Sequence, residues 1–303
     1  MKRVLFTGAA GFIGRHAIPV LVDRGFEVHA VDYSASGASP SPGIHWHVCD
    51  LLDPNASRKL VESVKPTHLL HLAWYTTHGK FWTAPENLTW VSASIRLLES
   101  FASVQGKRAV YAGTCAEYEW GGETLSEKTT PLIPSTLYGT SKHALQLIFS
   151  RACEEFRISS AWGRIFFLYG PGEHPARLVP SAILPLLEGK PAEFTHGRQV
   201  RDLLHAEDVA RAFVELLDSE VRGPVNIASG EARELREVID IIAGILGRKD
   251  LVRLDARPAP LNEPIRIVAN IRRLAEEVRF KPKLSLETGI TAVIQNFRKT
   301  RGN

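Results

Sequence analysis

The stretch TGAAGFIG, residues 7–14, follows a short apolar run and opens an amphipathic one. Its glycines, Gly8, Gly11 and Gly14, recur at intervals of three residues. Glycines let a backbone turn tightly and approach a pyrophosphate, whose charge is stabilised by the N-terminus of the following helix. A helix that only packs closely on its strand also uses glycines, but the order of strand, turn and helix favours a nucleotide site. The stretch therefore predicts a dinucleotide-binding turn.

The residue at the end of the next β-rich run indicates which dinucleotide is bound. That run, EVHAVD, ends at Asp32, 18 residues after Gly14. A carboxylate at this place accepts hydrogen bonds from an adenosine ribose and repels a 2′-phosphate. We therefore expect NAD as the cofactor. NADP stays open as the less favoured alternative, since the guanidinium of Arg15 could reach a phosphate.

The first half of the chain alternates β-rich runs with amphipathic stretches. The amphipathic stretches cover residues 12–24, 56–64, 87–104 and 137–156. Such alternation predicts βαβ units, and hence an α/β fold with a Rossmann-type, doubly wound parallel sheet covered on both faces.

The second half is less regular. Pro171, Gly172 and Pro175 interrupt the pattern, and residues 186–202 are expected to form short strands and turns. We expect a dinucleotide-binding domain of residues 1–170 plus about 203–229, and a smaller C-terminal substrate-binding domain of about 171–202 plus 230–303.

Composition and charge favour a small anionic ligand. The 303 residues are 44% hydrophobic and 23% charged, which is ordinary for a soluble globular protein. The net charge is +4, but the basic residues are scattered and form no run or stripe. We therefore expect no nucleic-acid partner.

Cysteine usage and hydropathy indicate a cytoplasmic protein. Cys49, Cys115 and Cys153 are odd in number and have no ligand-like spacing, so we expect neither a disulfide framework nor a metal site. The N-terminus leads directly into a strand pattern without a signal peptide, and no apolar run approaches 18 residues. We expect no membrane association.

A second short stretch carries the chemistry. LYGTSKHAL, residues 137–145, places Tyr138 four positions before Lys142 on one face of an expected helix, with Cβ atoms roughly 5–6 Å apart. Lowering the pKa of a phenol from about 10 to near 7 requires ~4 kcal/mol. An ammonium at about 5 Å supplies ~3 kcal/mol at an effective dielectric constant of 20. The pair predicts an acid/base tyrosine, and the spacing alone leaves a surface Tyr–Lys pair open.

Further motifs run nearly from end to end of the chain. They are CDLLD (49–53), HLAW (71–74), YAGTCAEY (111–118), YGTSK (138–142), RIFFLYGPG (164–172), LVPSAI (178–183), RQVRDLLHAEDVARA (198–212) and NIASG (226–230). Together with the triplet-spaced glycines, they make the sequence resemble the extended short-chain dehydrogenase/reductase family. The resemblance is to its NAD-dependent nucleotide-sugar epimerases, dehydratases and ketoreductases.

This resemblance implies an enzyme whose catalytic residues are Thr114, Tyr138 and Lys142. Tyr138 would be the acid/base, Lys142 would lower its pKa and hold the nicotinamide ribose, and Thr114 would donate a hydrogen bond to the reacting oxygen. The implied cofactor contacts are Gly8, Gly11, Phe12, Ile13, Gly14, Asp32, Asp50, Leu51, Leu72, Ala73, Trp74, Tyr138 and Lys142. Asp50 suits a helix N-cap equally well, and an aromatic core residue is the alternative for Trp74.

The resemblance also implies the substrate contacts, which are Thr114, Phe167, Arg177 and Arg201. Arg201 resembles the arginine that contacts the diphosphate of the sugar nucleotide, with a salt bridge as its alternative, and Arg177 is a second diphosphate candidate. Phe167 replaces the family's usual asparagine and makes the pocket more apolar. The aromatic stretch WYTTHGKFW (74–82) is expected to wall the site.

Two departures from the family narrow the reaction. Cys115 and Ala116 stand where the 4,6-dehydratases carry an Asp-Glu pair, so dehydration is not expected. Ala116 also stands where epimerase-reductases carry a cysteine, which disfavours two-base epimerisation. We expect 4-ketoreduction of a nucleoside-diphosphate 4-keto-6-deoxyhexose, or the reverse 4-dehydrogenation. An NDP-sugar 4-epimerase with tightly bound NAD is the main alternative, and a non-catalytic dinucleotide sensor is another.

The family's habit of pairing subunits through two helices, here within residues 87–104 and 137–156, implies a homodimer.

Overall fold

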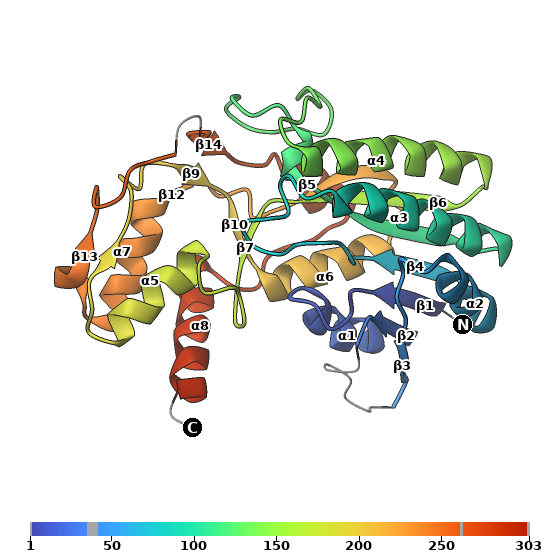
Figure 1. The fold of residues 1–303 in the computed structure, drawn as a ribbon, viewed down its shortest axis with the longest axis horizontal. Helices are drawn as coiled ribbons and strands as arrows, with labels where there is room; N and C mark the ends of the chain where they lie inside the picture. Colours follow the sequence, from blue (N-terminus) through green and yellow to red (C-terminus); the bar gives the residue numbers. More distant parts are fainter. Residues whose placement is uncertain (1, 35–41, 261–262, 302–303) are drawn as a thin grey trace.

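A seven-stranded parallel sheet forms the centre of the protein in the computed structural model, which describes residues 2–34, 42–260 and 263–301 (Figure 1). The strand order is β11-β6-β5-β4-β1-β2-β3. The strands are β1 (Lys2–Thr7), β2 (Phe26–Asp32), β3 (Ile44–Val48), β4 (His68–His71), β5 (Arg108–Thr114), β6 (Ser159–Ile165) and β11 (Gly223–Ile227). The predicted doubly wound α/β fold is confirmed.

Helices cover both faces of this sheet at its centre, where the strands are apolar on both sides. On one face α1 (Gly14–Asp23) packs against α6 (Ala206–Leu217), and on the other α3 (Glu86–Ser103) lies between α2 (Pro54–Val64) and α4 (Leu137–Glu155) (Figure 1). Helices α1 to α4 begin and end within two residues of the expected amphipathic stretches.

The strand order reverses at β1, which positions the site. β1 pairs with β2 on one side and with β4 on the other, so the connections after β1 and β4 leave in opposite directions. Thr7 is aligned with Val31 of β2 and with His71 of β4. In open α/β sheets, ligands bind in the crevice outside the carboxyl ends of the strands at such a reversal. The glycine turn begins at this point.

Apart from α6 and β11, the elements beyond β6 are built largely around a second apolar cluster. Its helices are α5 (Leu178–Leu187), α7 (Leu235–Leu246) and α8 (Leu286–Arg301). The short strands are β7 (Phe167–Tyr169), β8 (Ala192–Glu193), β9 (Val200–Arg201), β10 (Leu203–His205), β12 (Arg233–Glu234), β13 (Val252–Arg253) and β14 (Arg266–Ile267). Three single turns complete the chain, η1 (Cys115–Glu117), η2 (Lys249–Leu251) and η3 (Arg273–Glu277). The exact domain boundaries stay a prediction.

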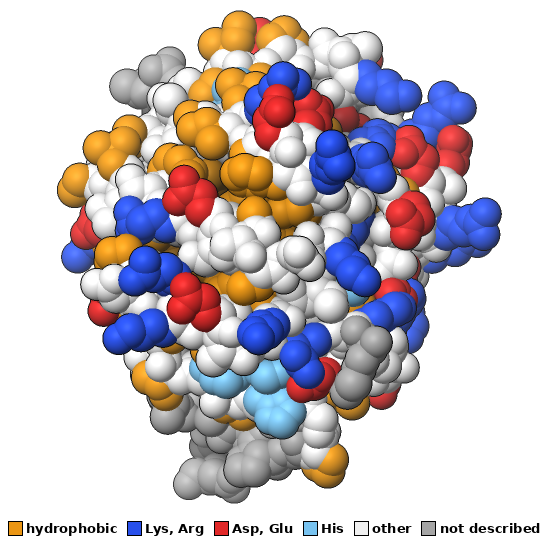
Figure 2. Space-filling view, turned by 90° about the vertical axis from the view of Figure 1, so that its right-hand side faces the viewer, with side chains coloured by type: hydrophobic (Ala, Val, Ile, Leu, Met, Phe, Trp, Pro, Cys, Tyr) orange, Lys and Arg blue, Asp and Glu red, His pale blue; other side chains and the backbone are white. Residues whose placement is uncertain are grey.

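The surface matches the scattered charge of the sequence. On the face drawn in Figure 2, basic and acidic side chains are interspersed. Within the described ranges, no helix has both the length and the apolar character needed to cross a bilayer.

Candidate active site

The glycine turn is built from close backbone contacts that a side chain would disrupt. Gly8 has a φ of +73° and its amide donates to the carbonyl of Val31, 3.1 Å away. A Cβ atom on Gly14 would lie 2.1 Å from the carbonyl oxygen of Gly8, and one on Gly8 would lie 2.8 Å from the amide nitrogen of Ala73. The sequence needs glycine here because the turn, the first helix and the β4 loop meet without room for a methyl group.

The start of α1 carries no side-chain cap from the described part of the chain. Ile13 occupies the N-cap position. Phe12 and Ile13 are half-buried at this end. Asp32, at the end of β2, accepts hydrogen bonds from the amides of Ala10 at 3.1 Å and Tyr33 at 2.9 Å. An uncapped helix N-terminus, a turn without side chains and a fixed carboxylate are the features that a dinucleotide requires.

Arg15, the residue that keeps NADP open, is turned toward another loop. Its guanidinium donates to the carbonyl of Pro171 and packs on Gly172. Partial burial lowers its pKa.

Two of the three predicted catalytic side chains meet at the carboxyl edge of the sheet. Thr114 is the last residue of β5, and Tyr138 lies in the first turn of α4, which is capped by the Thr136 hydroxyl. The Thr114 side chain lies close enough to Tyr138 to act on its pKa. The Tyr138 ring is packed edge-on by Phe81 at 4.9 Å and Trp82 at 5.8 Å between centroids. The 74–82 stretch therefore lies against the tyrosine, as expected.

The direction predicted for the pKa of Tyr138 is wrong. The Tyr–Lys spacing predicted a lowered value, but burial raises the pKa of Tyr138, and the Thr114 side chain opposes this only in part. At neutral pH the phenol therefore keeps its proton.

Lys142 is held by other groups. Its Nζ donates to the carbonyl of Ala112 at 2.8 Å and lies 3.6 Å from the centroid of the Trp74 ring. The side chain is only 3% exposed, and burial lowers the pKa of Lys142 to about 7. An ammonium over an aromatic face is attracted by the ring quadrupole. Trp74 thus positions Lys142, and its own Nε1 donates to Asn87 at 2.8 Å.

Glu117 is a polar residue of this region that the sequence analysis missed. It is fully buried, and its Oε1 accepts from the Thr114 amide at 2.8 Å and from Trp162 Nε1 at 2.9 Å. Its Oε2 accepts from Arg164 Nε at 2.7 Å. Thr114 and Glu117 form a capping box around η1, and the spacing T-x-x-E is a sequence signal for it. Glu117 therefore fixes the backbone that carries Thr114.

Further expected cofactor contacts lie after β3 and β4. Leu51 is buried, whereas Asp50 is exposed and its Oδ1 accepts from the amide of Leu52 at 2.9 Å. The N-cap of α2 is Asp53, so the alternative that Asp50 caps this helix is wrong. The Leu72 amide donates to the Thr7 carbonyl, which brings the β4 loop beside the glycine turn.

The substrate candidates separate into two groups. Arg201 is 4% exposed, and its Nη2 lies 2.8 Å from Glu263 Oε1, which is the salt bridge given as its alternative. Its guanidinium also lies 5.3 Å from the Phe167 ring centroid. Arg177, by contrast, acts electrostatically on Tyr138 and on Glu173, whose pKa burial raises to about 8. Arg177 is thus the arginine whose charge acts on the predicted acid/base.

Cys115 is a buried thiol, and burial raises its pKa to about 12.

Comparison with known proteins agrees with this geometry. A model of the NAD dependent epimerase/dehydratase family matches residues 4–228. The dTDP-glucose 4,6-dehydratase of Neisseria gonorrhoeae is 26% identical over 339 residues, which cover 99% of this chain and 97% of that protein. UDP-glucuronate 4-epimerase 4 of Arabidopsis thaliana is 26% identical over 331 residues, which cover 96% and 74%. The structure of UDP-glucose 4-epimerase from Thermus thermophilus in complex with NAD has a TM-score of 0.85 at 28% identity, covering 98% and 99%.

The family description names NAD, the cofactor that Asp32 predicted. Because the match spans most of the chain, from the glycine turn through Thr114, Tyr138 and Lys142 to β11, the resemblance is confirmed and the chain belongs to the NAD dependent epimerase/dehydratase family.

Proposed function

We propose that the protein is an NAD(H)-dependent oxidoreductase acting at C4 of a nucleoside-diphosphate sugar. The reaction we favour is reduction of an NDP-4-keto-6-deoxyhexose, or the reverse 4-dehydrogenation. The observation that carries this proposal is the place of Tyr138, packed edge-on by Phe81 and Trp82, beside Thr114 at the carboxyl edge of the sheet. A protonated tyrosine is the acid that reduction of a ketone requires.

The residues of the chain divide the chemical work between them. The turn at Gly8, Gly11 and Gly14 and the start of α1 would hold the pyrophosphate of NAD, which when bound supplies or accepts the hydride. Thr114 would hydrogen-bond the C4 oxygen, and Tyr138 would give this oxygen its proton in reduction or remove it in oxidation. Lys142, on the same helix one turn later, would orient the cofactor ribose.

The surroundings of Thr114 argue against elimination of water. Cys115 and Ala116 offer no carboxylate for an extra proton transfer. The next carboxylate along the chain, Glu117, is occupied on both oxygens by Thr114, Trp162 and Arg164. A carboxylate satisfied in this way by buried donors is not free to shuttle protons.

The walls of the site favour a deoxygenated sugar. Phe81 and Trp82 pack on Tyr138, and Trp82 also contacts Trp120 edge-on at 6.3 Å. Phe167 adds a further aromatic ring where the family carries an asparagine. Apolar rings suit a C5 methyl group better than a hydroxymethyl group, which would lose hydrogen bonds to water on binding.

A 4-epimerase is the second candidate. The observation that favours it is the similarity over 98% of the chain to the UDP-glucose 4-epimerase of Thermus thermophilus. Such an enzyme oxidises C4 and reduces it again on the other face, and it needs only the Thr, Tyr and Lys set present here.

The proposal includes a homodimer paired through α3 and α4. These helices expose Leu88, Leu147 and Ile148, at 58%, 56% and 44%. We expect wild-type protein to have the mass of a dimer in light scattering and Leu147→Glu to have that of a monomer. A monomeric wild type would refute the pairing.

One experiment separates the two reactions. The purified protein is denatured and any released dinucleotide is identified; NADH or NADPH is then offered with a panel of NDP-4-keto-6-deoxy sugars while nicotinamide absorbance is followed. Consumption of NADH that depends on a keto-sugar is the result expected of the ketoreductase. Stoichiometric bound NAD without net consumption would refute reduction and favour the epimerase.

A further inference from the structure

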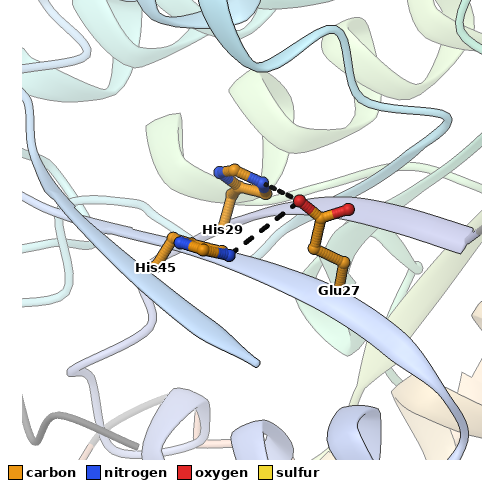
Figure 3. Close-up of side chains that lie close together, drawn as sticks. All are labelled: Glu27, His29 and His45. Atoms are coloured by element: carbon orange, nitrogen blue, oxygen red, sulfur yellow. Dashed lines mark hydrogen bonds and ion pairs between the residues drawn. The ribbon is translucent and has the colours of Figure 1, made fainter. Parts of the chain in front are cut away.

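Two neighbouring strands place metal-ligating side chains on one face of the sheet, away from the candidate active site. Residues two apart on a strand share a face, so Glu27 and His29 of β2 point the same way, and β3 adds His45, which is aligned with His29 in the parallel register. Figure 3 shows both imidazoles directed at the Glu27 carboxylate. We propose that Glu27, His29 and His45 bind a divalent transition-metal ion of the Zn²⁺ type.

The distances are close to those of a tetrahedral site. Glu27 Oε1 lies 3.1 Å from His29 Nε2 and 3.9 Å from His45 Nε2, and the ligand atoms of all three residues lie within 4.8 Å of one another. Bonds of about 2.0–2.1 Å at tetrahedral angles place two ligand atoms roughly 3.3 Å apart. His45 is 54% exposed, so a rotation of its ring can close the remaining gap.

The ligand atoms face one another. His29 Nε2 points at Glu27 Oε1, and a neutral imidazole offers a lone pair at one ring nitrogen. Arg3 Nε holds the other carboxylate oxygen, Glu27 Oε2, at 2.9 Å, which leaves Oε1 to face the imidazoles. The Arg3 charge weakens the attraction for a cation, and the site therefore relies on its nitrogen ligands.

His47 supplies the outer contact that metal-binding histidines usually have. Its Nε2 lies 2.9 Å from His29 Nδ1, the ring nitrogen that points away from Glu27. When His29 Nε2 binds a metal, Nδ1 carries the proton and needs an acceptor, and such contacts fix the tautomer and ring orientation. The rings of His29 and His47 are stacked with centroids 5.1 Å apart.

The donor set indicates the class of metal. Two imidazoles and one carboxylate are the ligands of Zn²⁺ sites that keep a fourth position for water. Hard ions such as Mg²⁺ prefer oxygen ligands throughout. In Figure 2, histidine side chains form a patch at the surface of the face that carries the sheet edge, so solvent reaches this region.

A bound ion would tie the edge strand β3 to β2. Asp32 lies three residues beyond His29, about 10 Å along the strand, and β3 leads directly to Asp50 and Leu51. The ion would thus stabilise the two strands that lead to the predicted adenosine contacts. This inference does not rest on the proposed function.

The test uses full-length protein without an affinity tag, treated with chelator and then dialysed. Zn²⁺ is titrated by calorimetry, and Co²⁺ by its visible d–d absorption. We expect one equivalent bound, a rise in Tm that saturates at that equivalent, and a Co²⁺ spectrum of low coordination number without sulfur-to-metal bands.

Variants locate the ion. His45→Gln, at an exposed position, should weaken binding more than about 100-fold and abolish the Tm rise, and His47→Gln should weaken it by about tenfold. His196→Gln, at a half-buried histidine between β8 and β9, is the matched control and should bind as wild type. Absence of stoichiometric binding, wild-type affinity in His45→Gln, or a thiolate-to-cobalt band would each overturn the proposal.

Discussion

Lys142→Met removes a buried ammonium while keeping a side chain of similar length. Lowering the pKa of this lysine from 10.5 to about 7 corresponds to about 5 kcal/mol, because each pH unit is worth ~1.36 kcal/mol. The side chain is only 3% exposed, so solvent does not screen this cost. The contact with Trp74 offsets about 2 kcal/mol while the amine is charged. We expect the variant to have a free energy of unfolding about 3 kcal/mol higher than wild type at pH 6.

The pH dependence gives this prediction its sign. Between the folded pKa of about 7 and the ordinary value of 10.5, the unfolded chain binds a proton that the folded protein does not. Stability of the wild type therefore rises with pH through this window relative to the variant. The full cost of the buried charge is present below the folded pKa, and it falls to about 1 kcal/mol by pH 10.

Urea unfolding at a series of pH values measures the difference in unfolding free energy between the variant and the wild type. The control is Lys59→Met, which changes an exposed lysine on α2. The control should differ little from wild type at any pH. The same Lys142→Met variant should lose turnover, because Lys142 serves the reaction although it destabilises the fold. Active sites often show this trade-off between stability and activity. A variant less stable than wild type at pH 6, or a difference that does not change with pH, would refute the reasoning.

Four further outcomes are expected. Tyr138→Phe should lower turnover by about 10²–10⁴-fold in a steady-state assay; wild-type turnover would remove Tyr138 from the mechanism. Because burial raises the pKa of Tyr138, ketone reduction should persist from neutral pH upward while alcohol oxidation accelerates with pH, and steady-state profiles showing the reverse would contradict the assignment. Gly14→Ala should destabilise the protein by at least about 1–3 kcal/mol, because its Cβ would meet a carbonyl oxygen at 2.1 Å; Gly122→Ala, with no atom within 4 Å of its Cβ, is the control in thermal melts. Glu117→Gln should cost about 3–5 kcal/mol in chemical denaturation, because it leaves a buried arginine unpaired, and a near-neutral effect would show that the ion pair does not hold β5.

Local sequence was sufficient to predict the first half of the fold. Helices α1 to α4 and the strands from β1 to β5, apart from the edge strand β3, each bury an apolar pattern that a short window of the sequence reveals. The short strands of the second half pair residues far apart, such as Val200 of β9 with Arg266 of β14 and with Glu234 of β12. No local pattern specifies such pairs, because each strand has only two residues.

The candidate site, like the fold, was predictable from the sequence only in part. The glycine turn and Asp32 follow from spacing along a single βαβ unit, and the structure brings them together. The direction predicted for the pKa of Tyr138 was wrong because the residues around the ring come from elsewhere in the chain. Phe81 and Trp82 pack on the ring, and Trp74 attracts the ammonium of Lys142. A helix spacing of four residues gives the separation of two side chains, but not what else surrounds them.

The sequence contains a signal for the proposed metal ligands, but a search limited to cysteines did not detect it. Metal ligands were sought among the cysteines, whereas E-x-H in β2 and H-x-H in β3 place four chemically capable side chains on one sheet face once the strands are aligned. Strand alignment is the step that a single sequence does not supply, because a shift of one residue would move His45 and His47 to the opposite face.

Burial of the Tyr138–Lys142 helix has one consequence for the pH dependence of the chemistry. It holds the tyrosine in its protonated form and brings the lysine near the point of losing its charge at pH 7. Reduction of a ketone consumes a proton at the new hydroxyl, whereas oxidation must first remove one. Reduction would use the phenol in the protonated form that burial favours, whereas oxidation would proceed faster as the pH rises and the phenol ionises. Burial of this helix therefore sets how each direction depends on pH, while the equilibrium between ketone and alcohol stays that of the cofactor and the sugar.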